Sequence, residues 1–172
     1  RWGRYWHGGP SAKVRQKRGD DGGCFMFALR AVLRFGGVIE HPEASAAWTA
    51  FDIARPPRSG GWVSAGLFRP GWTCCVEQGH YGHPARKATW LYAHTSERPQ
   101  DLVWGPSRAA RKLDAGFHSA EERASAKRSG WTEPSRLTDS ERMRTPPRFR
   151  DVLLGIAREE STSRHRVETG VP

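Results

Sequence analysis

Two short stretches of the chain place charged groups next to an apolar or aromatic run. Residues 81–92 read Tyr-Gly-His-Pro-Ala-Arg-Lys-Ala-Thr-Trp-Leu-Tyr, a turn with cations that leads into an aromatic strand. Residues 37–42 read Gly-Val-Ile-Glu-His-Pro, in which a short apolar run ends on the carboxylate of Glu40. Because α/β proteins bind ligands at the carboxyl ends of their strands, we expect Glu40 to meet a substrate rather than the core.

Both stretches also have plainer interpretations. Glu40 could serve only to cap a helix that follows Pro42, since acidic side chains are favourable near a helix N-terminus. Arg86 and Lys87 could belong to a turn whose charges face water, as most runs of charge do. These alternatives stay open on the sequence alone.

The chain is strongly basic. Its 172 residues carry 28 Lys and Arg and a net charge of +10. Such a charge is typical of proteins that bind a phosphate backbone, so DNA is the first partner to consider. The alternative is a basic surface that arises from arginine-rich composition and has no specific ligand. The residues predicted to bind nucleic acid are Arg86, Lys87, Tyr81, His83, Lys13, Arg15, Lys17 and Arg18.

Cysteine and histidine usage argues against a metal site. Cys74, Cys75, His80 and His83 lie within ten residues, but adjacent cysteines on a strand point to opposite faces and cannot easily share one ion. The odd cysteine count without framework spacing indicates a reducing, intracellular compartment. No apolar run approaches the roughly 20 residues that cross a bilayer. We therefore expect a soluble, cytoplasmic protein without a metal and without membrane contact.

The elements that position the candidate residues follow from hydrophobic periodicity. From Cys24 to Phe35 apolar residues recur at helical spacing, between two aspartates and two glycines. Val38-Ile39 then reads as a buried strand, and this order of helix, glycine turn and apolar strand is typical of a parallel α/β unit. The remaining predictions for this half are a helix over 43–51, a brief strand at 62–63, and strands over 73–77 and 89–93.

The second half of the chain is polar and basic. Residues 94–144 lack periodicity and are predicted to form a largely irregular insertion with one surface helix near Ser119–Lys127. Pro146-Pro147 suits the first turn of a last helix, whose apolar stripe runs from Phe149 to Ile156.

These patterns predict a single α/β domain over residues 24–158. A loop-rich basic segment, residues 1–23, precedes it, and a disordered tail, residues 159–172, follows it.

Three stretches, in this order and at this spacing, resemble motifs of the DNA cytosine-5 methyltransferases, in the type found in phages and prophages. Residues 36–42 resemble the family's strand ending Glu-Asn-Val, and residues 78–92 resemble its Tyr-Gly-x-Pro-Gln-x-Arg-x-Arg strand. Residues 145–158 resemble its final motif, where a proline-rich turn leads into a helix. Together these stretches cover roughly a quarter of the chain.

The resemblance implies a partial Rossmann-like methyltransferase domain with long irregular basic segments. In the family, the matching glutamate hydrogen-bonds the flipped cytosine ring and favours its N3-protonated form. A cysteine thiolate then adds at C6, and C5 takes the methyl group of S-adenosylmethionine. The glutamate's role would fall here to Glu40, and the cationic turn would bind DNA.

The chain departs from the family's pattern within the motifs. His41-Pro42 stands where the family has Asn-Val. Ala85 replaces the glutamine, and the two spaced arginines fall on Lys87 and Thr89. A lysine neutralises a phosphate but cannot copy the planar, bidentate fork of an arginine, so we expect less specific binding.

Two of the family's elements have no match. These are the glycine-rich strand that holds S-adenosylmethionine and the Pro-Cys loop that supplies the nucleophile, both upstream of the glutamate strand. Because the chain begins with Arg1 rather than Met, we expect a truncated segment of a longer protein, inactive alone. The alternative function is a non-catalytic basic module that binds nucleic acid.

Overall fold

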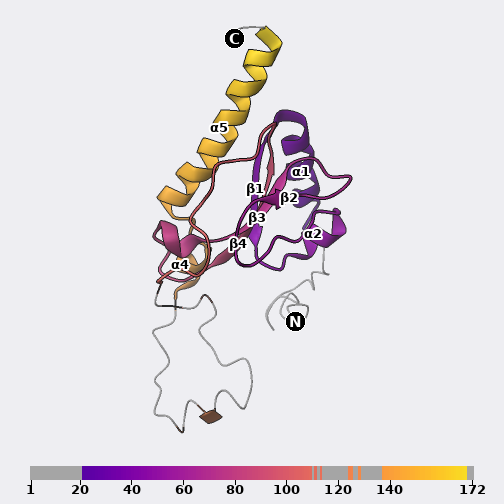
Figure 1. The fold of residues 1–172 in the computed structure, drawn as a ribbon. Helices are drawn as coiled ribbons and strands as arrows, with labels where there is room; N and C mark the ends of the chain where they lie inside the picture. Colours follow the sequence, from indigo (N-terminus) through magenta and orange to yellow (C-terminus); the bar gives the residue numbers. More distant parts are fainter. Residues whose placement is uncertain are drawn as a thin grey trace.

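The computed structural model describes residues 21–109, 111, 113, 124, 125, 128 and 137–169. Within them a four-stranded antiparallel sheet carries helices on both faces (Figure 1). Helices α1 (Cys24–Phe35) and α2 (Ala46–Ala50) pack on one face, and the long helix α5 (Pro147–Thr169) packs on the other. The prediction of a mixed helix and sheet domain is confirmed at this coarse level.

Helix α1 has the bounds predicted from its periodicity. Phe25 and Leu29 lie one turn apart and are both buried. The carboxylate of Asp21 accepts hydrogen bonds from the backbone N–H groups of Gly23 and Phe25, each 2.9 Å long. Because the first N–H groups of a helix lack partners within it, these bonds stabilise the start of α1.

The sheet has the strand order β1-β4-β3-β2. Its strands are β1 (Gly37–Pro42), β2 (Val63–Ser64), β3 (Trp72–Glu77) and β4 (Ala88–His94), and every neighbouring pair is antiparallel. The prediction that the strand with Glu40 belongs to a parallel unit is therefore wrong. The order of helix and strand along the chain does not reveal which strand will lie beside β1, and that neighbour, β4, runs in the opposite direction.

Strand β1 also continues beyond Glu40. Glu40 pairs with Leu91, and the next two residues still pair with Trp90 and Thr89. A proline is tolerated at position 42 because β1 lies at the edge of the sheet, where a missing N–H need not break a ladder. Glu40 therefore lies inside the strand, and its predicted place at the carboxyl end of the strand is corrected.

Alternation along β4 divides the core into two layers. Trp90 and Tyr92 pack with Trp48, which is fully buried and donates from Nε1 to the Thr73 hydroxyl at 3.0 Å. Leu91 points to the other layer, where it belongs to the cluster around the equally buried Phe149 of α5. Residues paired across antiparallel strands share a face, so the side chain of Glu40 lies on the α5 side.

Two short elements lie close to the start of α5. The 3-10 helix η2 (Gln78–Tyr81) follows β3 directly and packs against α5. Helix α4 (Asp139–Met143) precedes α5 and begins with a capping box, in which the Thr138 and Glu141 side chains each bond the other's backbone N–H. These elements bring residues 78–87 and 138–148 together at one end of the molecule.

Helix α5 starts at the predicted proline pair but runs further than predicted. Its backbone is helical to Thr169, so the helix extends into residues 159–169, for which the sequence analysis predicts a disordered tail. These residues contain no glycine or proline, and a helix that has already been nucleated gains one hydrogen bond for each residue added.

The predicted irregular insertion, residues 94–144, is described only in part. Residues 95–109 contain no helix or strand, whereas α4 lies near the end of the insertion. The helix predicted near Ser119–Lys127 lies mostly outside the described residues, as do residues 1–20.

Candidate functional site

Glu40 is held by polar partners from two other elements. Gln78 donates from Nε2 to the Glu40 carboxylate at 3.2 Å and to the Thr89 hydroxyl at 2.9 Å. Gln78 is fully buried at the start of η2, and Thr89 is fully buried on β4. The carboxyl group of Glu40 is thus positioned by residues 78–92, the stretch whose sequence resembles the family's second motif.

The surroundings of Glu40 favour its protonated form. Burial raises the pKa of this carboxyl above its ordinary value of 4.5, and the nearby charge of Lys87 and hydroxyl of Thr89 oppose the change only in part. Burial also lowers the pKa of Lys87, against the opposing attraction of Glu40. A half-buried carboxyl of this kind can both donate and accept a hydrogen bond at a pH where an exposed glutamate only accepts.

Lys87 connects Glu40 to the junction of α4 and α5. Its Nζ donates to the carbonyl oxygen of Arg144 at 3.0 Å and to that of Met143 at 3.5 Å. A cation at the carboxyl end of a helix is favourable because the last carbonyls lack partners within the helix. Lys87 adopts a φ of +31°, which non-glycine residues rarely do.

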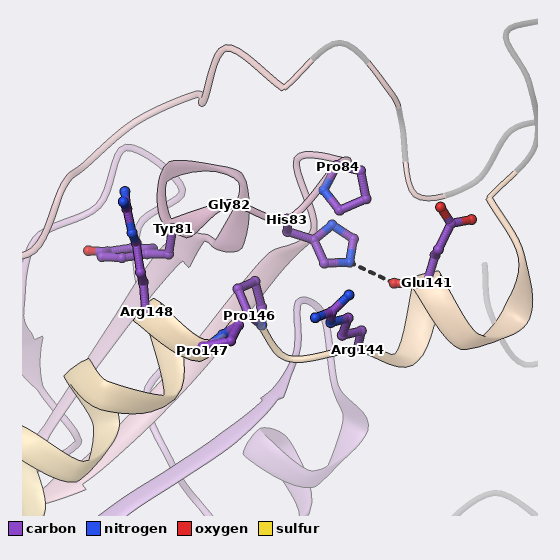
Figure 2. Close-up of a pocket in the computed structure, with 9 residues that line it drawn as sticks. All are labelled: Tyr81, Gly82, His83, Pro84, Glu141, Arg144, Pro146, Pro147 and Arg148. Atoms are coloured by element: carbon purple, nitrogen blue, oxygen red, sulfur yellow. Dashed lines mark hydrogen bonds between the residues drawn. The ribbon is translucent and has the colours of Figure 1, made fainter.

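A pocket of about 410 Å³ opens beside this junction (Figure 2). One wall is the turn from Tyr81 to Pro84, and the other consists of Glu141, Arg144 and Pro146 to Arg148. Arg144 and Arg148 are exposed, and neither guanidinium group has a hydrogen-bond or ion-pair partner among the described residues. The pocket therefore combines apolar walls with two available cations.

His83 forms part of the pocket wall but is buried, with 3% of its surface exposed. Its Nε2 donates to the backbone carbonyl of Glu141 at 3.0 Å, and its Nδ1 accepts from the N–H of Ala85 at 3.0 Å. Both ring nitrogens are therefore used, and the histidine fastens α4 to the turn.

Tyr81 supplies an aromatic surface to the same pocket. Its ring lies 5.2 Å from that of Phe149, centroid to centroid, and its hydroxyl oxygen accepts from the N–H of Val103 at 3.1 Å. Figure 2 shows the ring and the side chain of Arg148 next to each other at one end of the pocket. The ring is therefore held in place by α5 and by residues 95–109, which contain Val103.

A second pocket, of about 520 Å³, lies on the other side of the same turn. Gly79, His80 and Pro84 line it together with Pro106 and the exposed Arg108. Since Pro84 borders both pockets, residues 79–84 form the wall between them.

The structure brings five of the predicted residues into one region, and the other four lie outside the described residues. Glu40 and Lys87 are neighbours, and Tyr81 and His83 line the pocket. Arg86 is exposed on the same turn, where its N–H donates to the carbonyl of residue 111 at 3.2 Å. The predicted basic residues Lys13, Arg15, Lys17 and Arg18 lie outside the described residues.

The sequence analysis missed four residues of this region. Gln78 and Thr89 hold Glu40, and Arg144 and Arg148 flank the proline pair that opens α5. The arrangement Arg-Thr-Pro-Pro-Arg was a usable signal for the last two, because a proline pair that starts a helix fixes the direction of the residues beside it.

Comparison with known proteins places the chain in no family. No protein-family model, curated protein or solved structure matches it.

Neither of the two pockets described above offers a free acidic side chain for the ribose of S-adenosylmethionine. Nucleotide-like cofactors in α/β domains need an acidic side chain for the ribose hydroxyls. Glu141 is the one acidic residue that lines either pocket described above, and its carboxylate accepts from the Thr138 N–H and hydroxyl at 2.8 and 2.9 Å. That carboxylate is therefore already engaged at the start of α4.

The cysteines do not supply a nucleophile next to Glu40. Burial raises the pKa of the Cys75 thiol to about 11 and also raises that of Cys74, so neither forms a thiolate readily. Cys24 is exposed, but it lies on α1, across the sheet from the Glu40 side chain.

The described residues contain neither a metal-binding cluster nor a helix that could cross a bilayer. No three His, Cys, Asp or Glu side chains come together there as a metal site requires. None of the helices there has both the length and the apolar character needed to span a bilayer.

Proposed function

We propose that the chain contributes the cytosine-binding part of a DNA cytosine-5 methyltransferase-like domain, with Glu40 as the residue that contacts the base. The observation that supports this most is that Glu40 lies beside Gln78, Lys87 and Thr89, all in the segment that resembles the family's second motif. On this proposal the antiparallel sheet is one part of a larger cytoplasmic enzyme, and S-adenosylmethionine binds residues of that enzyme outside this sheet.

The chemistry of Glu40 suits the Watson–Crick edge of cytosine. That edge presents an acceptor at N3 beside the donor amino group at N4, and a protonated carboxyl offers the complementary donor and acceptor. Thymine presents the reverse pattern, a donor at N3 and an acceptor at O4. Gln78 donates to Oε1 of Glu40, which favours the acid proton on the other oxygen and therefore one order of donor and acceptor. A raised pKa keeps the carboxyl protonated over a wider pH range.

The second candidate is a non-catalytic module that binds nucleic acid through its basic surface. The exposed arginines beside the two pockets, Arg108, Arg144 and Arg148, favour it. The two candidates share a DNA partner and differ in whether Glu40 selects the base.

The test is the preference for an extruded cytosine. Fluorescence anisotropy measures the Kd for a labelled duplex that carries cytosine opposite an abasic site, which lowers the cost of extrusion, and for the same duplex with thymine. We expect about a ten-fold preference for cytosine at pH 5.5, the usual value of one good bidentate contact. Since the pKa of Glu40 is raised, the preference is fully present below that pKa and falls as the pH rises through it.

Two variants separate the candidates. Glu40→Gln keeps a donor and an acceptor but does not titrate, so its preference for cytosine should be the same at pH 5.5 and pH 8.5. Glu40→Ala should bind both duplexes equally. If Glu40→Ala prefers cytosine as strongly as the unmodified chain does, the base-reading role is wrong and the non-catalytic module is favoured.

A further inference from the structure

The pocket of about 410 Å³ between the turn and α5 has the composition of a nucleotide site. Tyr81, Pro84, Pro146 and Pro147 give it flat, rigid, apolar walls. Aromatic rings and similar flat surfaces stack on nucleobases of any sequence. The volume falls within the range of small-molecule sites and suits one nucleotide.

The charge at this pocket is positive. The guanidinium groups of Arg144 and Arg148 have no partner among the described residues. The carboxylate of Glu141 is the acidic group on the wall, and it is bonded to Thr138 and points away from the two arginines in Figure 2. The first turn of α5 contains no acidic residue. Guanidinium groups bind phosphate oxygens with paired N–H donors, so a phosphate is the group this rim accepts best.

The pocket is also connected to Glu40. Lys87 interacts with the Glu40 carboxylate and donates to the carbonyl of Arg144, a residue of the pocket. Lys87 therefore links Glu40 to the backbone of one pocket residue.

We propose that this pocket binds the nucleotide next to the target cytosine, with its base against Tyr81 and the prolines and its phosphate at the guanidinium group of Arg148. This assignment rests on the proposed function for the identity of the neighbouring base. The ligand chemistry, a flat base joined to a phosphate, follows from the pocket itself.

Arg148→Ala tests the phosphate contact, and Arg150→Ala is its matched control. Both arginines are exposed residues of α5, so each variant removes one positive charge, but Arg150 pairs with Asp151 and does not line the pocket. With the cytosine duplex described above, we expect Arg148→Ala to weaken binding about ten-fold, as for the loss of a charged hydrogen bond. We expect Arg150→Ala to weaken it less than about two-fold, as for a solvent-exposed charge. Equal effects of the two variants would overturn the assignment.

Removal of the neighbouring base tests the stacking contact. A duplex with an abasic residue next to the cytosine should bind about ten-fold more weakly, the usual contribution of one stacked base. Tyr81→Leu keeps an apolar contact with Phe149 but lacks the ring, so this variant should show a much smaller difference between the two duplexes. A difference as large as that of the unmodified chain would mean that the base does not stack on Tyr81. If Tyr81→Leu does not fold, the comparison of Arg148→Ala with Arg150→Ala decides alone.

Two further comparisons complete the test. One separates a nucleotide of DNA from a free nucleotide as the ligand, and the other separates the pocket assignment from the proposed function. Free thymidine monophosphate should displace the duplex only at concentrations far above the duplex Kd, and displacement near that Kd would make this a site for free nucleotides instead. If Arg148→Ala has its expected effect but the cytosine preference does not depend on Glu40, the pocket assignment stands and the proposed function fails. If the cytosine preference depends on Glu40 but Arg148→Ala and Arg150→Ala weaken binding equally, the proposed function stands and the pocket assignment fails.

Discussion

Replacement of Gly71 by alanine should lower the free energy of unfolding by about 3 to 5 kcal/mol, the sum of backbone strain and overpacking. Gly71 has a φ of +97°, which side-chain-bearing residues rarely adopt, and a Cβ atom there would lie 2.3 Å from the carbonyl oxygen of Ala93. That oxygen belongs to the backbone of β4, the strand paired with both β1 and β3, and cannot easily move aside. Urea denaturation followed by tryptophan fluorescence measures the change.

Gly82→Ala is the matched control for this prediction. Gly82 has the same φ of +97°, but a Cβ atom there would have no heavy atom within 4 Å. Gly82→Ala should therefore lower the free energy of unfolding only by the strain of the left-handed conformation, about 1 to 2 kcal/mol. Equal losses at the two glycines would show that the contact of Gly71 with β4 is not as close as described.

DNA affinity should fall about 100-fold when the salt concentration rises from 50 to 200 mM. Four cations, Arg86, Lys87, Arg144 and Arg148, lie on the turn or at the pocket rim. Each phosphate neutralised on duplex DNA contributes about −0.9 to the slope of log K against log salt, which for four contacts gives this loss. Fluorescence anisotropy over a salt series measures the slope.

Two triple variants show whether these residues are responsible. Arg86→Ala, Arg144→Ala and Arg148→Ala together should reduce the slope by about 3, one for each lost contact. The control variant combines Arg30→Ala, Arg55→Ala and Arg150→Ala, which removes the same charge from exposed positions away from the pocket. Identical slopes for the two variants would place the DNA surface elsewhere.

The elements with strong local signals were predictable from the sequence. Helix α1 has a clear apolar stripe, an acidic residue before its start and glycines after its end, and its bounds agree with the prediction. The start of α5 was equally clear because a proline pair preceded an apolar stripe, and Phe149 and Ile156 are indeed buried. In these elements the residues that decide the structure lie within a few positions of one another.

The direction and pairing of the strands were not predictable in the same way. The side chain of Glu40 reaches the α5 face because β1 pairs with β4, about fifty residues later in the chain. The buried amide of Gln78 is similarly remote, since its contact with Glu40 spans 38 positions. A pattern of apolar residues reports burial along one segment and carries no information about which distant segment lies beside it.

The most direct test of the central claim is a photo-cross-link from the target base. A duplex with 5-iodocytosine opposite an abasic site is irradiated in complex with the chain, and the modified peptide is identified by mass spectrometry. If Glu40 reads the base, the cross-link should fall on the peptide that contains Glu40 or on residues 78–92, and Glu40→Ala should reduce its yield. Cross-links confined to α1 or to residues 95–109, with a yield unaffected by Glu40→Ala, would contradict the claim that Glu40 binds cytosine.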